Sequence, residues 1–416
     1  MRKLLILIIT LLILFFTISC EKNGTISVWS NTDEFYNMID SYLKDHPDVQ
    51  IDFSIIDVYQ FENKLDPILA SGRGVPDIIV MESSYVRKYI ESGFLLDITD
   101  IYEANKEKII PYTVEVGSYN GRVYGLSWQA TPGAFFYRRS LAKKYFGTDD
   151  PAVIQTHFSD VDTFLKSAEL LKSKSNGSCV TIASQIDLFI IMLYMREQPW
   201  IVDKKLVIDD VVLKGMDVSK TLYDNRLEGR ITSWSEGWFA GLKGELKDNT
   251  GKDIEVFGYL VPTWGLSYVL KKNAPNTSGD WAMIEGPVPY RHGGTWIGAY
   301  KGTKHIEAVK NIIQYLTTDD DFLEQYALST GDFVSNLNVI EKIKDNFNEP
   351  FLGGQNHYAE FARLARNVNG RLVQGNDRTI LNYLSVSLND YLYNDKDKLD
   401  VIADFRNQIE TILDLK

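Results

Sequence analysis

The hydrophobic positions after residue 24 change period several times along the chain. Residues 25–29, 49–55 and 76–81 alternate or run apolar as strands do, whereas residues 34–46 and 59–71 repeat apolar side chains every three to four positions. Pro67 lies inside the second helical stretch and predicts a kink or a break there. The order strand, helix, strand, helix, strand favours a mostly parallel sheet with helices on both faces.

A separate apolar run occupies residues 256–267, which read VFGYLVPTWGLS. It is rich in β-forming side chains and ends at Pro262, so it predicts a buried strand. Trp264 follows at the carboxyl end of that strand, where ligands bind in open α/β sheets. An indole face suits a sugar ring, whose C–H faces are apolar, but a core position explains a single tryptophan equally well.

Helical repeats continue through the second half of the chain. They predict helices around residues 160–171, 306–316, 322–331, 361–368, 380–388 and 402–412. No internal repeat and no low-complexity linker interrupts them. The chain therefore predicts α/β organisation throughout, with a helical tail.

The first nineteen residues predict a secretory signal peptide. Two basic residues precede an apolar stretch, 4–16, that is too short to span a bilayer as a helix. Cys20 follows small residues and resembles the lipidated cysteine of the bacterial lipobox, although Thr17 stands where that motif has Leu. We therefore expect a signal peptide over 1–19, a lipid on Cys20, a tether over 20–24 and a position on the outer face of the cytoplasmic membrane. An ordinary signal peptide is the alternative.

Composition limits the classes of partner. The chain is 44% hydrophobic and 12% aromatic, as a globular protein with a large core would be. Cys179 is the only other cysteine, so a lipidated Cys20 leaves no internal disulfide. The net charge is −12 and no basic cluster is interleaved with aromatics, which argues against nucleic acid and against adsorption to anionic lipid.

Several segments, in order, resemble the extracellular solute-binding proteins (family 1) of carbohydrate ABC transporters, of the maltose-binding-protein type. They are ISVWSNTDEF, VPDIIVMESSYVRKYIESGFLLDITD, NGRVYGLSWQATPGAFFYRRSLAKKYFG and the stretch from GDWAMIEGPVPYRHGGTW to ALSTGDF. The resemblance implies an α/β, two-lobed periplasmic-binding-protein-like fold (type II), each lobe a mixed, mostly parallel sheet flanked by helices. It also implies a monomer that closes on a sugar and delivers it to the transmembrane subunits of an ABC permease, without catalysis, metal or cofactor.

The same resemblance places three crossings between the lobes, near residues 135–137, 296–298 and 333–335. The first lobe is then expected over 25–137 plus 297–335. The second lobe is expected over 138–296 plus 336–416.

Candidate ligand-binding residues in the first lobe follow predicted strands or precede the first crossing. They are Asn31, Asp33, Glu34, Glu82, Trp128, Gln129 and Thr131. Carboxylates and amides can take paired hydrogen bonds from sugar hydroxyls. Helix capping explains Asn31 and Glu34 equally well, and a solvated turn explains Glu82.

The candidates in the second lobe are mainly tryptophans. They are Trp264, Trp296, Trp234, Gln185 and Asp187. Trp264 matches the stacking position that the resemblance implies, and two glycines before Trp296 allow a close backbone approach. Trp234 and Trp238 are four residues apart and alternatively mark a buried helix face, which we favour for Trp238.

Two rival functions remain open. A glycoside hydrolase needs two carboxylates across one bond, which 56 acidic residues do not exclude, whereas the five histidines lack zinc-ligand spacing. A binder of peptide or polyamine would use the same fold, and carboxylates with aromatics also suit cations. An anionic ligand would favour Arg or Lys, which the candidate set lacks, so a neutral sugar is preferred. The sequence leaves the sugar, its length and linkage, the permease and the role of Cys179 open.

Overall fold

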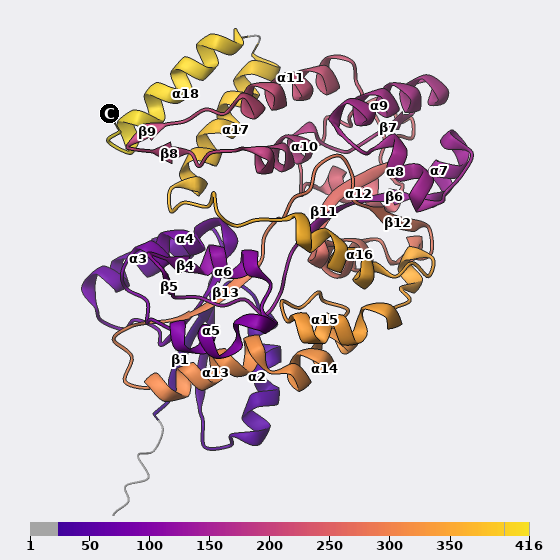
Figure 1. Cartoon of the computed structure of the whole chain (residues 1–416). Helices are drawn as coiled ribbons and strands as arrows, with labels where there is room; N and C mark the ends of the chain where they lie inside the picture. Colours follow the sequence, from indigo (N-terminus) through magenta and orange to yellow (C-terminus); the bar gives the residue numbers. More distant parts are fainter. Residues whose placement is uncertain (1–23, 395, 416) are drawn as a thin grey trace, which may run out of the picture.

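The computed structural model describes residues 24–394 and 396–415. The expected signal peptide, the lipidated Cys20 and most of the tether lie outside these residues. Figure 1 shows two lobes, one containing β1, β13, α2, α3 and α13 and the other containing β6, β11, α10, α17 and α18. Segments from distant parts of the chain meet where the lobes join.

The sheet of the first lobe has the strand order β13-β3-β1-β2. β1 (Ile26–Ser30) is parallel to both β2 (Ile51–Ile55) and β3 (Ile78–Glu82), whereas β13 (Thr295–Ala299) is antiparallel to β3. The helices α2 (Glu34–Asp45) and α3 (Phe61–Ser71) connect the parallel strands. This confirms the predicted parallel arrangement. However, α3 continues through Pro67 as one helix, so the expected break does not occur in it.

Both faces of this sheet are covered by helices. Ile78 and Val80 of β3 lie in a cluster with side chains of α2 and α13 (Ile306–Thr318). Ile79 and Met81 point to the other face, into a cluster with α3 and α4 (Ser83–Glu91). Side chains alternate along a strand, so one apolar strand serves two cores. Because helices cover both faces, the polar residues that follow the parallel strands lie at the carboxyl edge of the sheet.

The second lobe contains a three-stranded sheet of order β11-β6-β12. β6 (Gly133–Arg138) is central and antiparallel to both β11 (Gly258–Pro262) and β12 (Trp281–Ile284). A short parallel pair joins β7 (Cys179–Val180) to β10 (Glu255–Val256), and β10 directly precedes β11 in sequence. The predicted buried strand within 256–267 is thus confirmed as β10 and β11. The parallel pattern of the first lobe does not extend to this sheet.

The remaining elements cover these sheets or connect them. In or next to the first lobe are α5 (Thr99–Asn105), α6 (Pro111–Gly117), β4 (Ser118–Tyr119), β5 (Arg122–Val123), α14 (Asp320–Thr330) and α15 (Leu337–Ile343). In the second lobe are α7 (Arg139–Phe146), α8 (Pro151–His157), α9 (Val161–Ser175), α10 (Gln185–Met192), β8 (Ile201–Val202), β9 (Lys205–Leu206), α11 (Asp210–Asp224), α12 (Glu236–Lys243) and α16 (His357–Leu364). The predicted helical tail is present as α17 (Asp377–Tyr393) and α18 (Lys398–Ile412), which pack on α10 and α11.

Three chain segments cross between the lobes as one hydrogen-bonded ribbon. The central segment, 126–133, pairs on one side with 290–297, through the bridges Leu126–Ile297 and Pro132–Arg291. It also pairs with residues 333–335, because Ala130 N–H donates to Phe333 O and Ser335 N–H donates to Trp128 O. By strand pairing, residues 133–138 belong to the sheet of the second lobe, whereas the expected boundary at 137 put most of them in the first.

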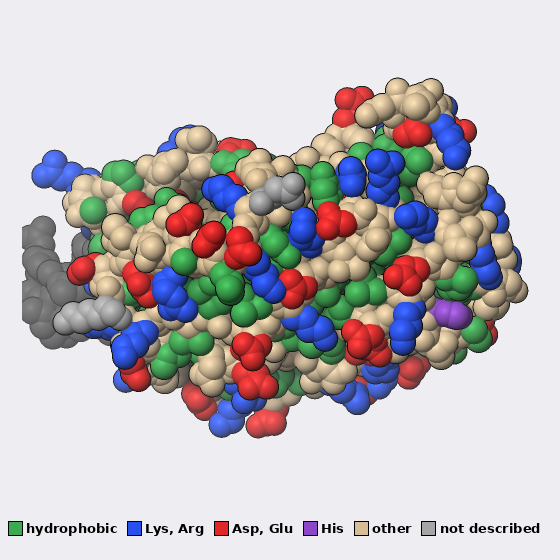
Figure 2. Space-filling view, turned by 90° about the horizontal axis from the view of Figure 1, so that it is seen from above, with side chains coloured by type: hydrophobic (Ala, Val, Ile, Leu, Met, Phe, Trp, Pro, Cys, Tyr) green, Lys and Arg blue, Asp and Glu red, His purple; other side chains and the backbone are tan. Residues whose placement is uncertain are grey.

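The surface carries both signs of charge. Figure 2 shows acidic and basic side chains interspersed over one face, without a broad area of one sign. In the described part of the chain, no helix combines the length and the apolar character needed to cross a bilayer.

Candidate ligand-binding site

Three indole rings stack at the carboxyl end of β11. The ring of Trp234 lies 5.0 Å from that of Trp238, at 24°, and 5.9 Å from that of Trp264, at 25°. Trp264 is fixed by its Nε1–H, which donates to His292 O at 3.1 Å. Trp238 is buried, as favoured from the sequence, but Trp234 is 51% exposed. The three rings line a cavity of about 170 Å³, which we call the tryptophan pocket.

Asp187 of α10 supplies the acidic group of the tryptophan pocket. Its carboxylate accepts hydrogen bonds from Ser233 Oγ at 2.6 Å and from Trp238 Nε1 at 3.2 Å. Burial raises the pKa of Asp187 to about 6, although these two hydrogen bonds act in the opposite direction. The carboxylate therefore holds the indole stack in place and offers its remaining lone pairs to a hydroxyl donor.

Trp234 has an unusual backbone conformation. Its φ is +67°, in the left-handed region that bulky side chains rarely adopt. The next residue, Ser235, caps α12 by accepting a hydrogen bond from Trp238 N–H at 3.4 Å. A strained backbone at an exposed aromatic residue persists only where its surroundings hold it, and such positions concentrate at ligand sites.

The residues predicted after β1 do lie at the carboxyl edge of the first sheet. Asp33 is the N-cap of α2 without a side-chain cap bond, and Thr32 instead accepts from Glu34 N–H, so Asn31 is not a cap. Asn31 Oδ1 is buried and has no partner among the described residues. Glu34 is buried and accepts a hydrogen bond from Tyr326 Oη at 2.7 Å.

Glu34 interacts with a residue of the second lobe and so lies at the junction of the lobes. Burial raises the pKa of its carboxyl, and the hydrogen bonds from Tyr326 and Tyr268 lower it. Tyr268 follows β11 in the second lobe, and burial and then the charge of Glu34 raise its own pKa. A first-lobe carboxylate therefore lies next to a second-lobe phenol.

Glu82, Gln129 and Thr131 lie near the crossing ribbon. Glu82 is the N-cap of α4, where its carboxylate accepts from Ser84 N–H at 2.8 Å and from Ser83 Oγ at 2.7 Å, so it is not a solvated turn residue. Gln129 is buried and donates to Thr295 Oγ1 at 3.3 Å. The buried Thr131 donates to Gly293 O at 3.2 Å. The bonds of Gln129 and Thr131 join two segments of the ribbon, whereas those of Glu82 are local to the start of α4.

Three other candidates are enclosed within the protein. Trp296 is 1% exposed, packs with Met81 and Val86 in the first-lobe core, and donates from Nε1 to Thr113 O at 2.8 Å. Trp128 is fully buried. Gln185 is buried and donates to Tyr393 Oη at 2.9 Å, at the end of α17. The structure thus gives these side chains packing contacts and places them outside the tryptophan pocket.

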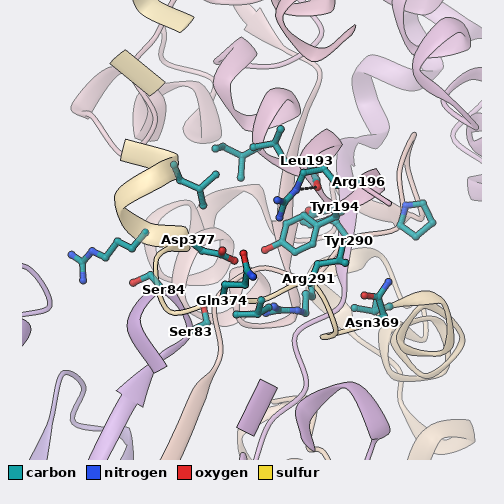
Figure 3. A pocket seen from close by; sticks show the side chains of 17 residues that line it. Ser83, Ser84, Leu193, Tyr194, Arg196, Tyr290, Arg291, Asn369, Gln374 and Asp377 are labelled. Atoms are coloured by element: carbon teal, nitrogen blue, oxygen red, sulfur yellow. Dashed lines mark hydrogen bonds between the residues drawn. The ribbon is translucent and has the colours of Figure 1, made fainter. Parts of the chain in front are cut away.

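A second cavity, of about 150 Å³, lies between the first lobe, the second lobe and the segment before α17. We call it the arginine cavity, since it is lined by Arg196, Arg291 and Arg378, together with Ser83, Tyr194 and Asp377 among others. Figure 3 shows Tyr194 and Asp377 turned toward each other across it. Ile190 lines both cavities, and Arg291 of one precedes His292 of the other.

The sequence did not indicate the polar residues of the arginine cavity. Arg196 follows a short 3-10 turn, and Asp377 begins a helix far along the chain, so neither lies after a predicted strand. The one available signal was Arg291, a charged side chain in the PYRHGGTW crossing. In the described residues no group of three or more His, Cys, Asp or Glu side chains is arranged to hold a metal ion.

A family model described as bacterial extracellular solute-binding protein matches residues 37–349. The chain belongs to this family. The relationship that the sequence segments indicated is therefore confirmed, and the family consists of binding proteins rather than enzymes.

Among curated relatives of this solute-binding protein, the arabinooligosaccharide-binding protein of Bacillus subtilis (strain 168) is 29% identical over 118 residues. The match spans 27% of each chain, so it covers about a quarter of that relative.

Solved structures show the same two-lobed fold. An extracellular solute-binding protein of family 1 superposes with a TM-score of 0.81 at 18% identity, over 93% of this chain and 99% of the other. The ABC transporter associated binding protein from B. animalis subsp. lactis Bl-04, in complex with β-1,6-galactobiose, gives 0.73 at 19% identity, over 93% and 97%. At these identities the likeness establishes the fold, and the predicted fold class is confirmed.

Proposed function

We propose that this chain is the substrate-binding lipoprotein of an ABC importer. It captures a mono- or oligosaccharide in the cleft between its lobes, closes on it and delivers it to the permease. Binding involves no covalent step. The ring of the sugar stacks on indole, and carboxylates take hydrogen bonds from its hydroxyls.

The observation that carries this proposal is an indole stack with a half-exposed ring, Trp234, beside a buried carboxylate. Trp234 and Trp264 offer an apolar face. Asp187 lines the same cavity and can accept a hydrogen bond from a ligand hydroxyl. A sugar ring needs this combination, because its C–H faces are apolar and its rim is polar. The carbohydrate ligands of the related proteins support the same class of substrate.

Calorimetric titration with a panel of mono- and oligosaccharides tests the proposal. We expect saturable binding of at least one sugar, with the sugar recovered unchanged by chromatography after prolonged incubation. Cleavage of the sugar would instead support a glycoside hydrolase. Binding only of peptides or polyamines would leave the assignment as a binding protein intact and show that its ligand is not a sugar.

Lipidation at Cys20 and delivery to a permease complete the proposal. They rest on the signal-like first nineteen residues and on the extracellular family to which the chain belongs. Deletion of the cognate permease genes, once located, should abolish uptake of the bound sugar while leaving binding to the purified protein unchanged.

A further inference from the structure

Arg291 is a buried cation that forms no ion pair with a described residue. Its side chain is 5% exposed, and its Nε has no hydrogen-bond acceptor among the described residues. Within residues 24–394 and 396–415, no carboxylate lies within ion-pair distance of the Arg291 guanidinium. Its guanidinium carbon lies 5.7 Å from the ring of Tyr194 and 6.0 Å from that of Tyr112. Aromatic faces compensate a desolvated charge only in part.

Arg196 adds a second cation to the same cavity. Its Nε donates to Leu193 O at 3.1 Å, the contact drawn in Figure 3, and its Nη1 is buried and finds no acceptor in the described residues. Its guanidinium carbon lies 4.1 Å from the ring of Trp200. Two guanidinium groups thus keep unused N–H donors at the wall of one cavity.

The carboxylates nearby leave these N–H donors without an acceptor among the described residues. Arg378 is paired with Glu62 at 2.6 Å, so it is already neutralised. Asp377 is the one carboxylate that lines the cavity, and its Oδ1 has no partner among the described residues. Glu82, just before Ser83, is occupied by the hydroxyl and N–H groups at the start of α4. None of these carboxylates accepts a hydrogen bond from Arg291 Nε or Arg196 Nη1, so both donors are available to a ligand.

We propose that the arginine cavity binds a carboxylate of the ligand, so that the substrate is an acidic saccharide that carries a uronic acid. This rests on the proposed function and names its substrate class. The carboxylate accepts hydrogen bonds from Arg291 and Arg196, as planar guanidinium groups favour, while Asp377 accepts from a ring hydroxyl. A neighbouring sugar unit then reaches the tryptophan pocket past Ile190.

The size of the two cavities agrees with a ligand of two or more rings. Each is smaller than the range of about 300–1,000 Å³ that small-molecule sites usually have, and together they reach its lower end. The earlier preference for a neutral sugar rested on a candidate set without arginine. The structure removes that reason.

Calorimetry with matched pairs of sugars tests the proposal on the purified protein. The pairs are digalacturonic acid with galactobiose and glucuronic acid with glucose, and glucose 6-phosphate serves as a different oxyanion. We expect the acidic member of at least one pair to bind at least about tenfold more tightly, a difference of about 1.4 kcal/mol. Its affinity should fall with added salt, and that of the neutral member should not.

Variants separate charge recognition from folding. Arg291→Met should weaken binding of the acidic member at least about tenfold more than binding of the neutral member, and Arg291→Lys should keep part of the preference. Arg196→Met gives a second test if Arg291→Met does not fold. Arg363→Met, which removes a half-exposed arginine on α16, is the matched control and should change neither sugar.

Equal or tighter binding of the neutral member in every pair would overturn the proposal. A preference for glucose 6-phosphate alone would overturn the assignment of a carboxylate. If neutral sugars bind and no acidic one does, the acidic substrate is wrong and the sugar-binding function stands. If no saccharide binds, both fail.

Discussion

The indole rings of Trp234 and Trp264 are nearly parallel, 25° apart, although one precedes α12 and the other follows β11. Two elements of the second lobe therefore build one aromatic surface. The hydrogen bond from Trp264 Nε1 to His292 O ties that surface to the segment that crosses to the first lobe.

Replacement of Trp264 should weaken ligand binding more than it weakens the fold. We expect Trp264→Ala to raise the Kd of the bound sugar at least about tenfold, because it removes the stacking face, and Trp264→Phe to give a smaller loss. Calorimetry measures both. Leu399→Ala on α18, where the side chain is 70% exposed, is the control and should leave Kd unchanged. An unaltered Kd in Trp264→Ala would reject this residue as part of the site.

Trp296 should behave in the opposite way. Its side chain fills the first-lobe core, so we expect Trp296→Ala to lower the free energy of unfolding by about 3–5 kcal/mol. The affinity of the folded fraction should stay within about twofold. Urea denaturation and calorimetry give the two values. A large loss of affinity with wild-type stability would instead place Trp296 at the ligand.

Asp187 should make stability depend on pH in a defined window. Its pKa is raised from about 4 in the unfolded chain to about 6 in the folded protein, so the folded state binds more protons between these values. The stabilising contribution is complete below about pH 4 and is lost as the pH rises through about 6, by at most about 3 kcal/mol.

The difference between the wild type and Asp187→Asn isolates this contribution, because other buried carboxyls titrate in both proteins. Thermal unfolding from pH 4 to pH 8 should show the variant gaining stability relative to the wild type as the pH rises. Parallel curves over the whole range would show that burial does not shift this group.

Cys20→Ser should release the protein from the cell. Without the thiol no lipid can be attached, so we expect the variant in the medium or the soluble extracellular fraction, while the wild type stays with the membrane. Metabolic labelling with palmitate should mark only the wild type. Membrane retention of the variant without label would indicate another anchor.

The sequence was sufficient for β1, β2, β3 and β11, for the helical tail and for the residues that follow β1 and β11. The period of the apolar positions determines these elements, and the parallel order of β1, β2 and β3 makes those three strands end at one edge. The sequence was insufficient for the arginine cavity, since Arg196 and Asp377 meet only when α17 packs on α10 and α11. The sequence also could not distinguish Trp296 from Trp264, because glycine and threonine flank both. Only the structure shows that Trp296 is buried in the core.

The crossing ribbon limits how the lobes can move. Its three segments are joined laterally by backbone hydrogen bonds, among them Leu126 N–H to Ile297 O at 3.1 Å and Ala130 N–H to Phe333 O at 2.9 Å. One segment cannot slide past the next without breaking those bonds, so the least costly motion is flexing of the whole ribbon about a single axis. We therefore expect any opening and closing of the lobes to follow one coordinate, which a single pair of distance labels, one on each lobe, is enough to record.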